Sequence, residues 1–325
     1  MKKILITGCN GFLGSHILSS LLNEKKFESN EEIIGIDNYI SSRKTNTFKS
    51  NTKFTLIEAD LIKFNFDQLK EFDIVIHLAS LASPVYYKKF PLETIDIGTK
   101  VTRLLLEKCK EWNARFLFFS SSEIYGNPSP ENIPTTEDYK GYVSCQGPRS
   151  CYDESKRLGE TLCYIYNTKY DVKTNIIRPF NIYGPGMSIK TDYRMIPNLM
   201  KSALKKQAIN IYGNGFQTRT FCYYKDAIQG IIKVIENGEY GETYNIGNDY
   251  PEISMIDLVK LFSKTINIDL NYTLTPYPSF YPEDEPIRRL PSIEKARKNL
   301  NYQPKVSLEE GLSKTWSWAK KTESL

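Results

Sequence analysis

The turn Thr7-Gly8-Cys9-Asn10-Gly11-Phe12-Leu13-Gly14 decides the fold of this chain of 325 residues. It follows a short apolar run, Lys3–Thr7, and precedes a segment in which apolar residues recur at helical spacing. The pattern G-x-x-G-x-x-G allows a sharp turn and lets a phosphate approach the backbone closely. A helix that starts at such a turn presents free N–H groups and a positive dipole end. Strand, turn and helix together predict a site for the pyrophosphate of a dinucleotide.

The second strand ends in an acid that bears on the choice of dinucleotide. Asp37 lies about twenty residues past the glycines, where a carboxylate accepts hydrogen bonds from a ribose and repels a 2′-phosphate. The sequence therefore favours NAD over NADP, although Arg43 and Lys44 follow nearby. Asp60, at the end of the third strand, either faces the adenine amine or caps the next turn. The residues expected to hold NAD are Gly8, Gly11, Phe12, Leu13, Gly14, Asp37, Asn38, Asp60, Leu61, Ala79, Tyr152 and Lys156.

The first half of the chain alternates short β-branched runs with helical patterns, such as the one that carries Val101, Leu104 and Leu105. This alternation predicts an α/β fold with a doubly wound parallel sheet. The expected strands are Lys3–Thr7, Glu32–Asp37, Phe54–Asp60, Asp73–Ala79, Arg115–Ser120 and Lys173–Arg178. Beyond them, prolines and glycines break the pattern. We expect a Rossmann domain over residues 1–178 and a smaller α/β substrate lobe over 179–325, with a segment around 218–236 packing back on the first domain.

Composition argues against several classes of protein. The 43 basic and 38 acidic residues give a net charge of +5 and are scattered, so nucleic acid is not an expected partner. No apolar run approaches the ~20 residues that span a bilayer, and the N-terminus lacks the pattern of a signal peptide. Six cysteines without a C-x-x-C pair, with only two histidines, speak against a metal site. Free thiols in the cytoplasm are expected.

Tyr152 and Lys156 lie four residues apart at the start of a predicted helix, so their side chains share one face. A phenol has a pKa of about 10 and is a poor base at neutral pH. A nearby ammonium and the positive charge of a nicotinamide stabilise the phenolate, which makes Tyr152 a candidate general base for a hydroxyl group. Ser121-Ser122-Glu123 follow the fifth strand, at the edge of the sheet where open α/β folds bind ligands.

These motifs resemble those of the extended short-chain dehydrogenases/reductases, a superfamily that includes the NAD-dependent nucleotide-sugar epimerases and dehydratases. Within it, three stretches resemble the UDP-glucuronate decarboxylases, also called UDP-xylose synthases. Ser122-Glu123-Ile124-Tyr125-Gly126 is similar to their S-E-V-Y-G. Gly147-Pro148-Arg149-Ser150-Cys151-Tyr152-Asp153-Glu154 is similar to G-P-R-x-C-Y-D-E. Arg289–Ile293 and Leu308–Leu312 are similar to R-x-P-D-I and L-E-E-G-L.

The resemblance implies a reaction and the residues that perform it. Oxidation of UDP-glucuronate at C4 by NAD gives a 4-keto sugar, which loses carbon dioxide, and return of the hydride yields UDP-xylose. The catalytic residues implied are Ser121, Ser122, Glu123, Tyr152, Lys156 and Arg289. The substrate-binding residues expected are Asn181, Arg194, Tyr212, Gln217 and Arg219. The resemblance also implies a homodimer that pairs helices near Tyr152.

The sequence departs from the decarboxylase pattern and leaves alternatives open. Gly186 stands where these enzymes often have a basic residue, Ile95 where many relatives have asparagine, and Ser121 where threonine is commoner. A nucleotide-sugar 4-epimerase needs no Glu123, and a 4,6-dehydratase is expected to have aspartate at the position of Ser122. A non-catalytic NAD-sensing module has no need of a base beside the nicotinamide. Decarboxylation is the principal prediction.

Overall fold

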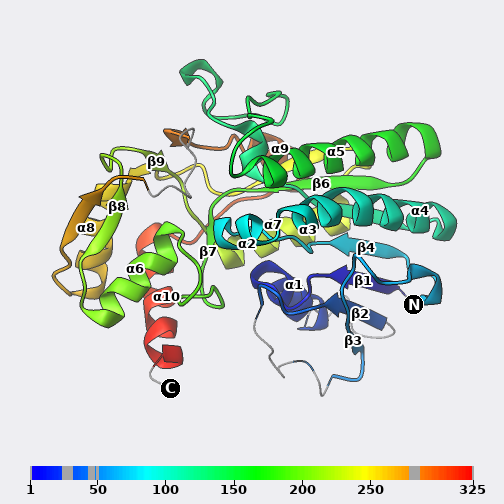
Figure 1. Cartoon of the computed structure of the whole chain (residues 1–325), viewed down its shortest axis with the longest axis horizontal. Coiled ribbons are helices and arrows are strands. Elements are labelled where there is room, and N and C mark those ends of the chain that lie inside the picture. The colour runs from blue at the N-terminus through cyan, green and yellow to red at the C-terminus, as the bar shows by residue number, and fades with distance from the viewer. Residues whose placement is uncertain (1, 24–31, 43–47, 49–50, 278–285, 324–325) are drawn as a thin grey trace.

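Seven parallel strands form one sheet in the computed structural model, which describes residues 2–23, 32–42, 48, 51–277 and 286–323. Their order is β3-β2-β1-β4-β5-β6-β11, and Figure 1 shows the sheet between two layers of helices. The strands are β1 (Lys3–Thr7), β2 (Glu32–Asp37), β3 (Phe54–Glu58), β4 (Ile74–His77), β5 (Arg115–Phe119), β6 (Thr174–Pro179) and β11 (Thr243–Ile246). The order reverses between β1 and β4, which is the switch point of a doubly wound fold. The predicted fold class is therefore confirmed.

All six strands predicted from the sequence form; β1 and β2 have the predicted bounds, and the other four differ by one or two residues at an end. The largest difference is at β4, which spans Ile74–His77 and not Asp73–Ala79, because the chain turns into the cavity described below after His77. The seventh strand, β11, is not predicted from the sequence. It has four residues, pairs in parallel with β6, and follows a long excursion of the chain into the second lobe.

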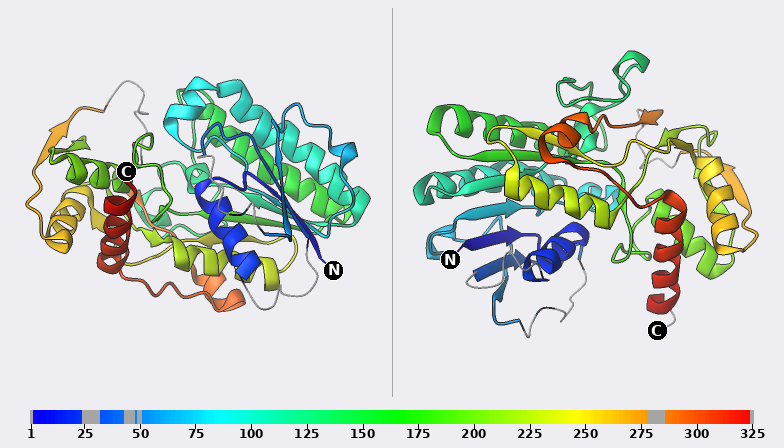
Figure 2. Two further views of the ribbon diagram at one scale, coloured as in Figure 1. Left: turned by 90° about the horizontal axis from the view of Figure 1, so that it is seen from below. Right: turned by 180° about the vertical axis from the view of Figure 1, so that it is seen from behind.

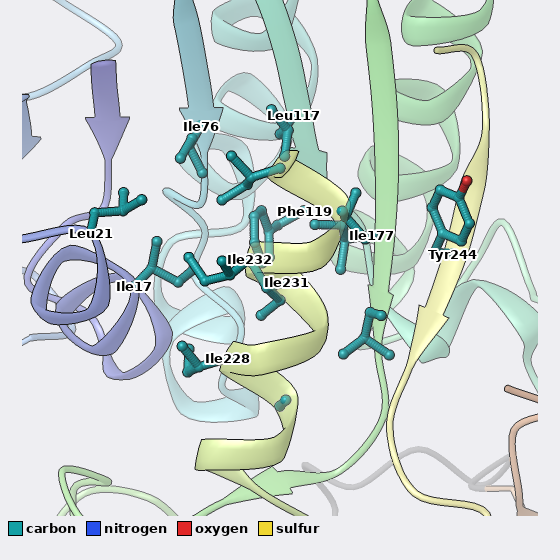
Figure 3. Packing of buried hydrophobic residues seen from close by; sticks show 14 of the residues in the cluster. Ile17, Leu21, Ile76, Leu117, Phe119, Ile177, Ile228, Ile231, Ile232 and Tyr244 are labelled. Carbon is teal, nitrogen blue, oxygen red and sulfur yellow. The ribbon is translucent and has the colours of Figure 1, made fainter. Parts of the chain in front are cut away.

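One face of the sheet is covered by α1 (Phe12–Asn23) and α7 (Tyr224–Asn237), with α9 (Glu294–Leu300) beside β11. Figure 3 shows Ile17 of α1 and Ile231 of α7 against Leu117 and Ile177 of the strands. These aliphatic side chains are fully buried, so burial of this layer contributes roughly 1.5–3 kcal/mol for each of them. The packing fixes where α1, and the glycine turn before it, sit relative to the sheet.

The opposite face is covered by α3 (Pro91–Asp96), α4 (Thr102–Trp112) and α5 (Ser150–Tyr170). In α4 the expected apolar stripe is partly wrong. Its buried residues recur at Thr102, Leu105, Leu106 and Cys109, a regular helical spacing, so Leu104 lies off the stripe and is exposed.

A second lobe with its own core lies beyond one end of the strands (Figures 1 and 2). Its helices α6 (Met195–Lys205), α8 (Met255–Ile266) and α10 (Leu308–Glu323) pack around the parallel pair β8 (Ile209–Tyr212) and β13 (Tyr272–Thr275). Short strands form the junction with the sheet: β7 (Ile182–Tyr183), β9 (Thr218–Arg219), β10 (Cys222–Tyr223), β12 (Ile253–Ser254) and β14 (Arg288–Arg289).

The chain crosses between the two lobes more than once. α7 overlaps the segment around 218–236 that is expected to pack back on the sheet, while β11 and α9 join the sheet layers from still further along the chain. The division into residues 1–178 and 179–325 stays a prediction. In the parts of the chain that the structure describes, no helix has the length and apolar character needed to cross a membrane.

Candidate active site

A cavity of about 1060 Å³ lies between the carboxyl ends of the strands and the second lobe. The sheet contributes the turns that follow β1, β4, β5 and β6, and the lobe contributes residues of α6, β8 and β9. The volume is at the upper end of the range for small-molecule sites. Such a volume is expected where a dinucleotide and a second ligand are held together.

The glycine turn has no room for side chains at two of its glycines. A Cβ on Gly14 would lie 2.2 Å from the Gly8 carbonyl oxygen, and one on Gly8, whose φ is +70°, would lie 2.7 Å from the Ala79 nitrogen. The cavity is lined by Gly8, Gly11, Phe12, Leu13 and Gly14 at the start of α1. A compact backbone cradle at a helix N-terminus fits a pyrophosphate.

Two buried hydroxyl groups of the cavity wall have no hydrogen-bond partner within the described protein. They are the Oγ atoms of Ser83, which precedes α2 (Pro84–Lys89), and Ser120, which follows β5. Because buried polar groups are rarely left unpaired, these hydroxyls are suited to bonds with a bound polar ligand. The residues present therefore fit NAD together with a polar second ligand.

Asp37 accepts hydrogen bonds from the Asn10 nitrogen at 2.9 Å, the Tyr39 nitrogen at 2.8 Å and the Ser42 hydroxyl at 3.1 Å. Its carboxylate thus fastens β2 to the glycine turn. Asp60 accepts a hydrogen bond from the Ile62 nitrogen at 3.1 Å and so caps the turn that follows β3, one of the two roles expected for it. The expected NAD contacts that are not among the cavity-lining residues are Asp37, Asn38, Asp60, Leu61 and Ala79. Arg43 and Lys44 lie outside the described residues.

Tyr152, Lys156 and Ser121 meet in the cavity wall. Burial raises the pKa of Tyr152, as does the nearby charge of Asp153, whereas a hydrogen bond with Ser121 and the charges of Arg194 and Arg149 act in the opposite direction. The Lys156 ammonium lies 5.8 Å from the centroid of the Tyr152 ring and donates to the Phe119 carbonyl oxygen at 2.7 Å. Tyr152, the predicted base, thus lies beside both Ser121 and the amine of Lys156, as the sequence predicts.

Glu123 is held between two arginines from distant parts of the sequence. It lies in the 3₁₀ helix Ser122–Tyr125, directly after β5, and its backbone nitrogen donates to the Ser121 hydroxyl. Its Oε2 atom accepts from Arg149, the residue before α5, and from Arg289 of β14 at 2.7 Å. The Arg149 Nε also donates to Asp153 at 2.7 Å. Two guanidinium groups and two carboxylates thus form one largely buried cluster.

All five residues expected to bind substrate line the cavity, but their polar groups already contact the protein. Arg194 forms an ion pair with Asp192, and Arg219 donates to the carbonyl oxygens of residues 218, 286 and 287. Asn181 donates to the Thr220 carbonyl oxygen and Gln217 to that of Tyr212. The Tyr212 ring lies 6.1 Å from that of Tyr277. A ligand must therefore compete with, or add to, these bonds.

Sequence reasoning missed three residues of this site. Arg149 and Asp153 lie in the stretch that resembles G-P-R-x-C-Y-D-E, and their spacing of four residues, which suits an ion pair at a helix start, was the available signal. Tyr87 of α2 stacks on Tyr152, with ring centroids 5.5 Å apart and planes at 20°, and carried no sequence signal. In the portion of the chain that the structure describes, no three His, Cys, Asp or Glu side chains gather as metal ligands.

Comparison with known proteins places the site in a family. The model of the NAD dependent epimerase/dehydratase family matches residues 4–247. The chain belongs to this family. It is 38% identical over 312 residues to UDP-glucuronic acid decarboxylase 2 of Arabidopsis thaliana, covering 95% of this chain and 66% of that one. It is 38% identical over 315 residues to decarboxylase 6 of the same plant, covering 95% and 86%.

A solved structure of a UDP-glucuronic acid 4-epimerase from Bacillus cereus, in complex with UDP-glucuronic acid and NAD, has the same fold. The TM-score is 0.83 at 29% identity, and the match covers 98% of this chain and 99% of that one. For this member of the epimerase/dehydratase family, the predictions of an NAD-dependent enzyme and of a Rossmann sheet are thus confirmed. The assignment of individual residues to NAD or substrate stays a prediction.

Proposed function

We propose that this chain converts UDP-glucuronate to UDP-xylose by NAD-dependent decarboxylation. The observation that carries the proposal is the convergence on Glu123 of Arg149 and Arg289. These residues come from the three stretches that resemble the decarboxylases, and 166 positions separate Glu123 from Arg289. Decarboxylases from Arabidopsis thaliana, Danio rerio and Xenopus tropicalis, 36–38% identical to this chain over nearly its whole length, support the same substrate and outcome.

The first task of the protein is to remove the proton of the C4 hydroxyl. Tyr152 is the proposed base, and Ser121 bonds its phenol oxygen. Lys156 lies one helical turn away, and the charge of its protonated form favours the phenolate. Tyr87 holds the ring plane by stacking. Bound NAD supplies an acceptor and later a donor of hydride at its nicotinamide ring. Positioned acid–base groups of this kind contribute about 10²–10⁴ in rate.

The second task is the loss of the carboxylate. With a carbonyl at C4, the sugar is a β-keto acid. The C5–C6 bond breaks, its electron pair moves to the C4 oxygen as an enolate, and carbon dioxide leaves. A proton is then added at C5. We assign this region of the substrate to Ser122, Glu123 and Arg289, because all three line the cavity that Tyr152 also lines, and Arg289 donates to Glu123.

The other residues predicted from the sequence would bind the nucleotide sugar and NAD. Arg194 and Arg219 are the cations proposed to face the diphosphate, and guanidinium forks suit phosphate oxygens. Asn181, Tyr212 and Gln217 line the same cavity. The glycine turn and Asp37 would hold NAD, together with Asn38, Asp60, Leu61, Ala79, Tyr152 and Lys156.

A 4-epimerase is the alternative with an observation in its favour, because the Bacillus cereus epimerase of similar fold binds UDP-glucuronic acid. A single experiment separates the outcomes. Purified protein is incubated with UDP-glucuronate and NAD, and the products are examined by mass spectrometry and NMR. Decarboxylation gives UDP-xylose and carbon dioxide, and epimerisation gives a product of unchanged mass. An unchanged mass with inversion at C4 would replace the proposal by the epimerase.

A homodimer and a cytoplasmic location complete the proposal. Exposed apolar side chains gather on the helices that cover one face of the sheet: Leu92 and Ile95 of α3, and Leu158, Tyr164 and Ile165 of α5. Pairing of this face with a second copy would bury them. All six cysteines are free thiols, as expected in a reducing compartment. The molar mass measured by light scattering tests the dimer, with a monomer at micromolar concentration as the contrary result.

A further inference from the structure

One side chain links the loop that carries Glu123 to the helix that carries Tyr152. Arg149 immediately precedes α5, donates through Nε to Asp153 at 2.7 Å, and pairs through its NH2 group with Glu123. Asp153 follows Tyr152 directly in the sequence and is buried with it on the first turn of α5. The guanidinium of Arg149 therefore joins the two parts of the site by charge-assisted bonds.

The charges of the cluster balance only when Arg149 is present. Arg149 and Arg289 carry two positive charges, and Glu123 and Asp153 carry two negative ones. Without Arg149, two carboxylates would face one guanidinium in a region from which water is largely excluded. A substrate that brings a further carboxylate would then meet a net negative charge.

We propose that Arg149 is a positioning residue that sets Glu123 relative to Tyr152, so that loss of carbon dioxide follows C4 oxidation without delay. The inference rests on the proposed decarboxylation. Arg289 also contacts Glu123, but it does so from β14, at the junction of the two lobes. Asp153 fixes one side of the guanidinium fork and so directs the other side to Glu123.

A lysine cannot replace this arrangement. It carries the same charge but offers a single ammonium in place of a planar fork that bridges two carboxylates. In Arg149→Lys the net charge of the cluster is unchanged, but the bridge that fixes the position of Glu123 is lost. A misplacement of about 1 Å can cost about a hundredfold in rate, so kcat should fall by about that factor while KM changes little. In Arg149→Met both the charge and the bridge are lost, and KM for UDP-glucuronate should rise as well.

Isotope effects distinguish positioning from a merely structural role. If the variant slows only the decarboxylation, the carbon isotope effect on the released carbon dioxide rises above that of the wild type. The deuterium effect from substrate labelled at C4 moves toward its equilibrium value. Asp153→Asn removes the carboxylate charge that anchors Nε. It should therefore raise the carbon isotope effect and move the deuterium effect toward its equilibrium value, as Arg149→Lys does. Arg297→Lys is the matched control, since Arg297 forms an equivalent fork with Asp249 outside the cavity.

The outcomes separate the two proposals. Wild-type protein that forms no UDP-xylose overturns the proposed function itself. Active wild type, with isotope effects unchanged in Arg149→Lys and Asp153→Asn, overturns the positioning role alone, whether or not these variants melt at a lower temperature. Isotope effects that change in both variants and stay constant in Arg297→Lys support it.

Discussion

The Lys156 ammonium donates to the carbonyl oxygen of Phe119, the last residue of β5, at 2.7 Å. This bond anchors the first turns of α5 to the carboxyl end of β5. The side chain lies over the Phe118 ring, 5.2 Å from its centroid, and is almost completely buried. Burial lowers the pKa of Lys156 to about 7, with partial compensation from Glu160.

The lowered pKa of Lys156 predicts a pH dependence of stability. In the unfolded chain the amine titrates near its ordinary pKa of about 10.4. Between pH 7 and 10 the unfolded state therefore binds a proton that the folded state has lost, and the contribution of Lys156 to the free energy of unfolding rises with pH, by at most about 1.4 kcal/mol per unit. Urea titrations of NAD-free wild type and Lys156→Met measure the free energy of unfolding of each. From pH 7 to 10 this free energy should rise for the wild type relative to the variant. A constant or opposite difference would contradict the lowered pKa.

Replacement of Tyr152 by phenylalanine should remove the proposed base and leave the fold intact, because the ring still stacks on Tyr87. We expect kcat to fall by about 10²–10⁴, with nucleotide-sugar affinity within a few-fold of the wild type. Product formation and calorimetric binding give the two readouts. Tyr170→Phe, on the exposed end of the same helix, is the control. Retention of full activity by Tyr152→Phe would exclude Tyr152 as the base.

Glu123→Gln should reduce the release of carbon dioxide far more than NAD binding. The amide keeps the shape of the side chain but not the charge that Arg149 and Arg289 hold. Loss of a single preorganised charged group in a site of low dielectric typically costs about 10²–10³ in rate. Glu154→Gln, on an exposed part of α5, should behave as wild type. If Glu123→Gln retains the wild-type rate, the cluster is not the decarboxylation site.

The glycine turn predicts a graded loss of NAD affinity. A Cβ at Gly14 would overlap the Gly8 carbonyl oxygen at 2.2 Å, whereas one at Gly11 would lie 3.3 Å from the same atom. Gly14→Ala must move the backbone that forms the pyrophosphate cradle and should weaken NAD binding at least about tenfold, or ~1.4 kcal/mol. Gly11→Ala should cost less. Calorimetry on both variants checks the order, and equal affinities would argue against the cradle.

Local sequence patterns were sufficient to predict the fold where each strand is followed directly by its helix. β1, the glycine turn and α1 form one continuous segment, and β2, β4, β5 and β6 each contain successive apolar residues that are buried or half-buried. β11 was missed because it is short, and its place beside β6 depends on where the second lobe returns the chain. No local pattern carries that information.

The same distinction holds for the site. Tyr152 and Lys156 share a helix face, so their adjacency follows from spacing alone. The contact of Arg149 with Glu123 joins residues 26 positions apart and depends on the path of the intervening loop. The pairing of Arg194 with Asp192 was likewise not predicted, because two residues in a loop have no fixed relative direction.

Arg115 provides a last prediction, about the stability of the sheet. Its buried guanidinium bonds Asn175 of β6 and the carbonyl oxygens of Val234, Ile235 and Gly238 at the C-terminal end of α7. A cation at this end also complements the helix dipole.

Arg115→Met would leave several buried carbonyl oxygens without donors, at about 1–3 kcal/mol for each that water cannot reach. We therefore expect a loss of roughly 3–5 kcal/mol in the free energy of unfolding. Arg297→Met, at a half-buried ion pair, should cost about 1 kcal/mol or less. Urea unfolding measures both, and equal losses would show that the Arg115 bonds do not hold α7 to the sheet.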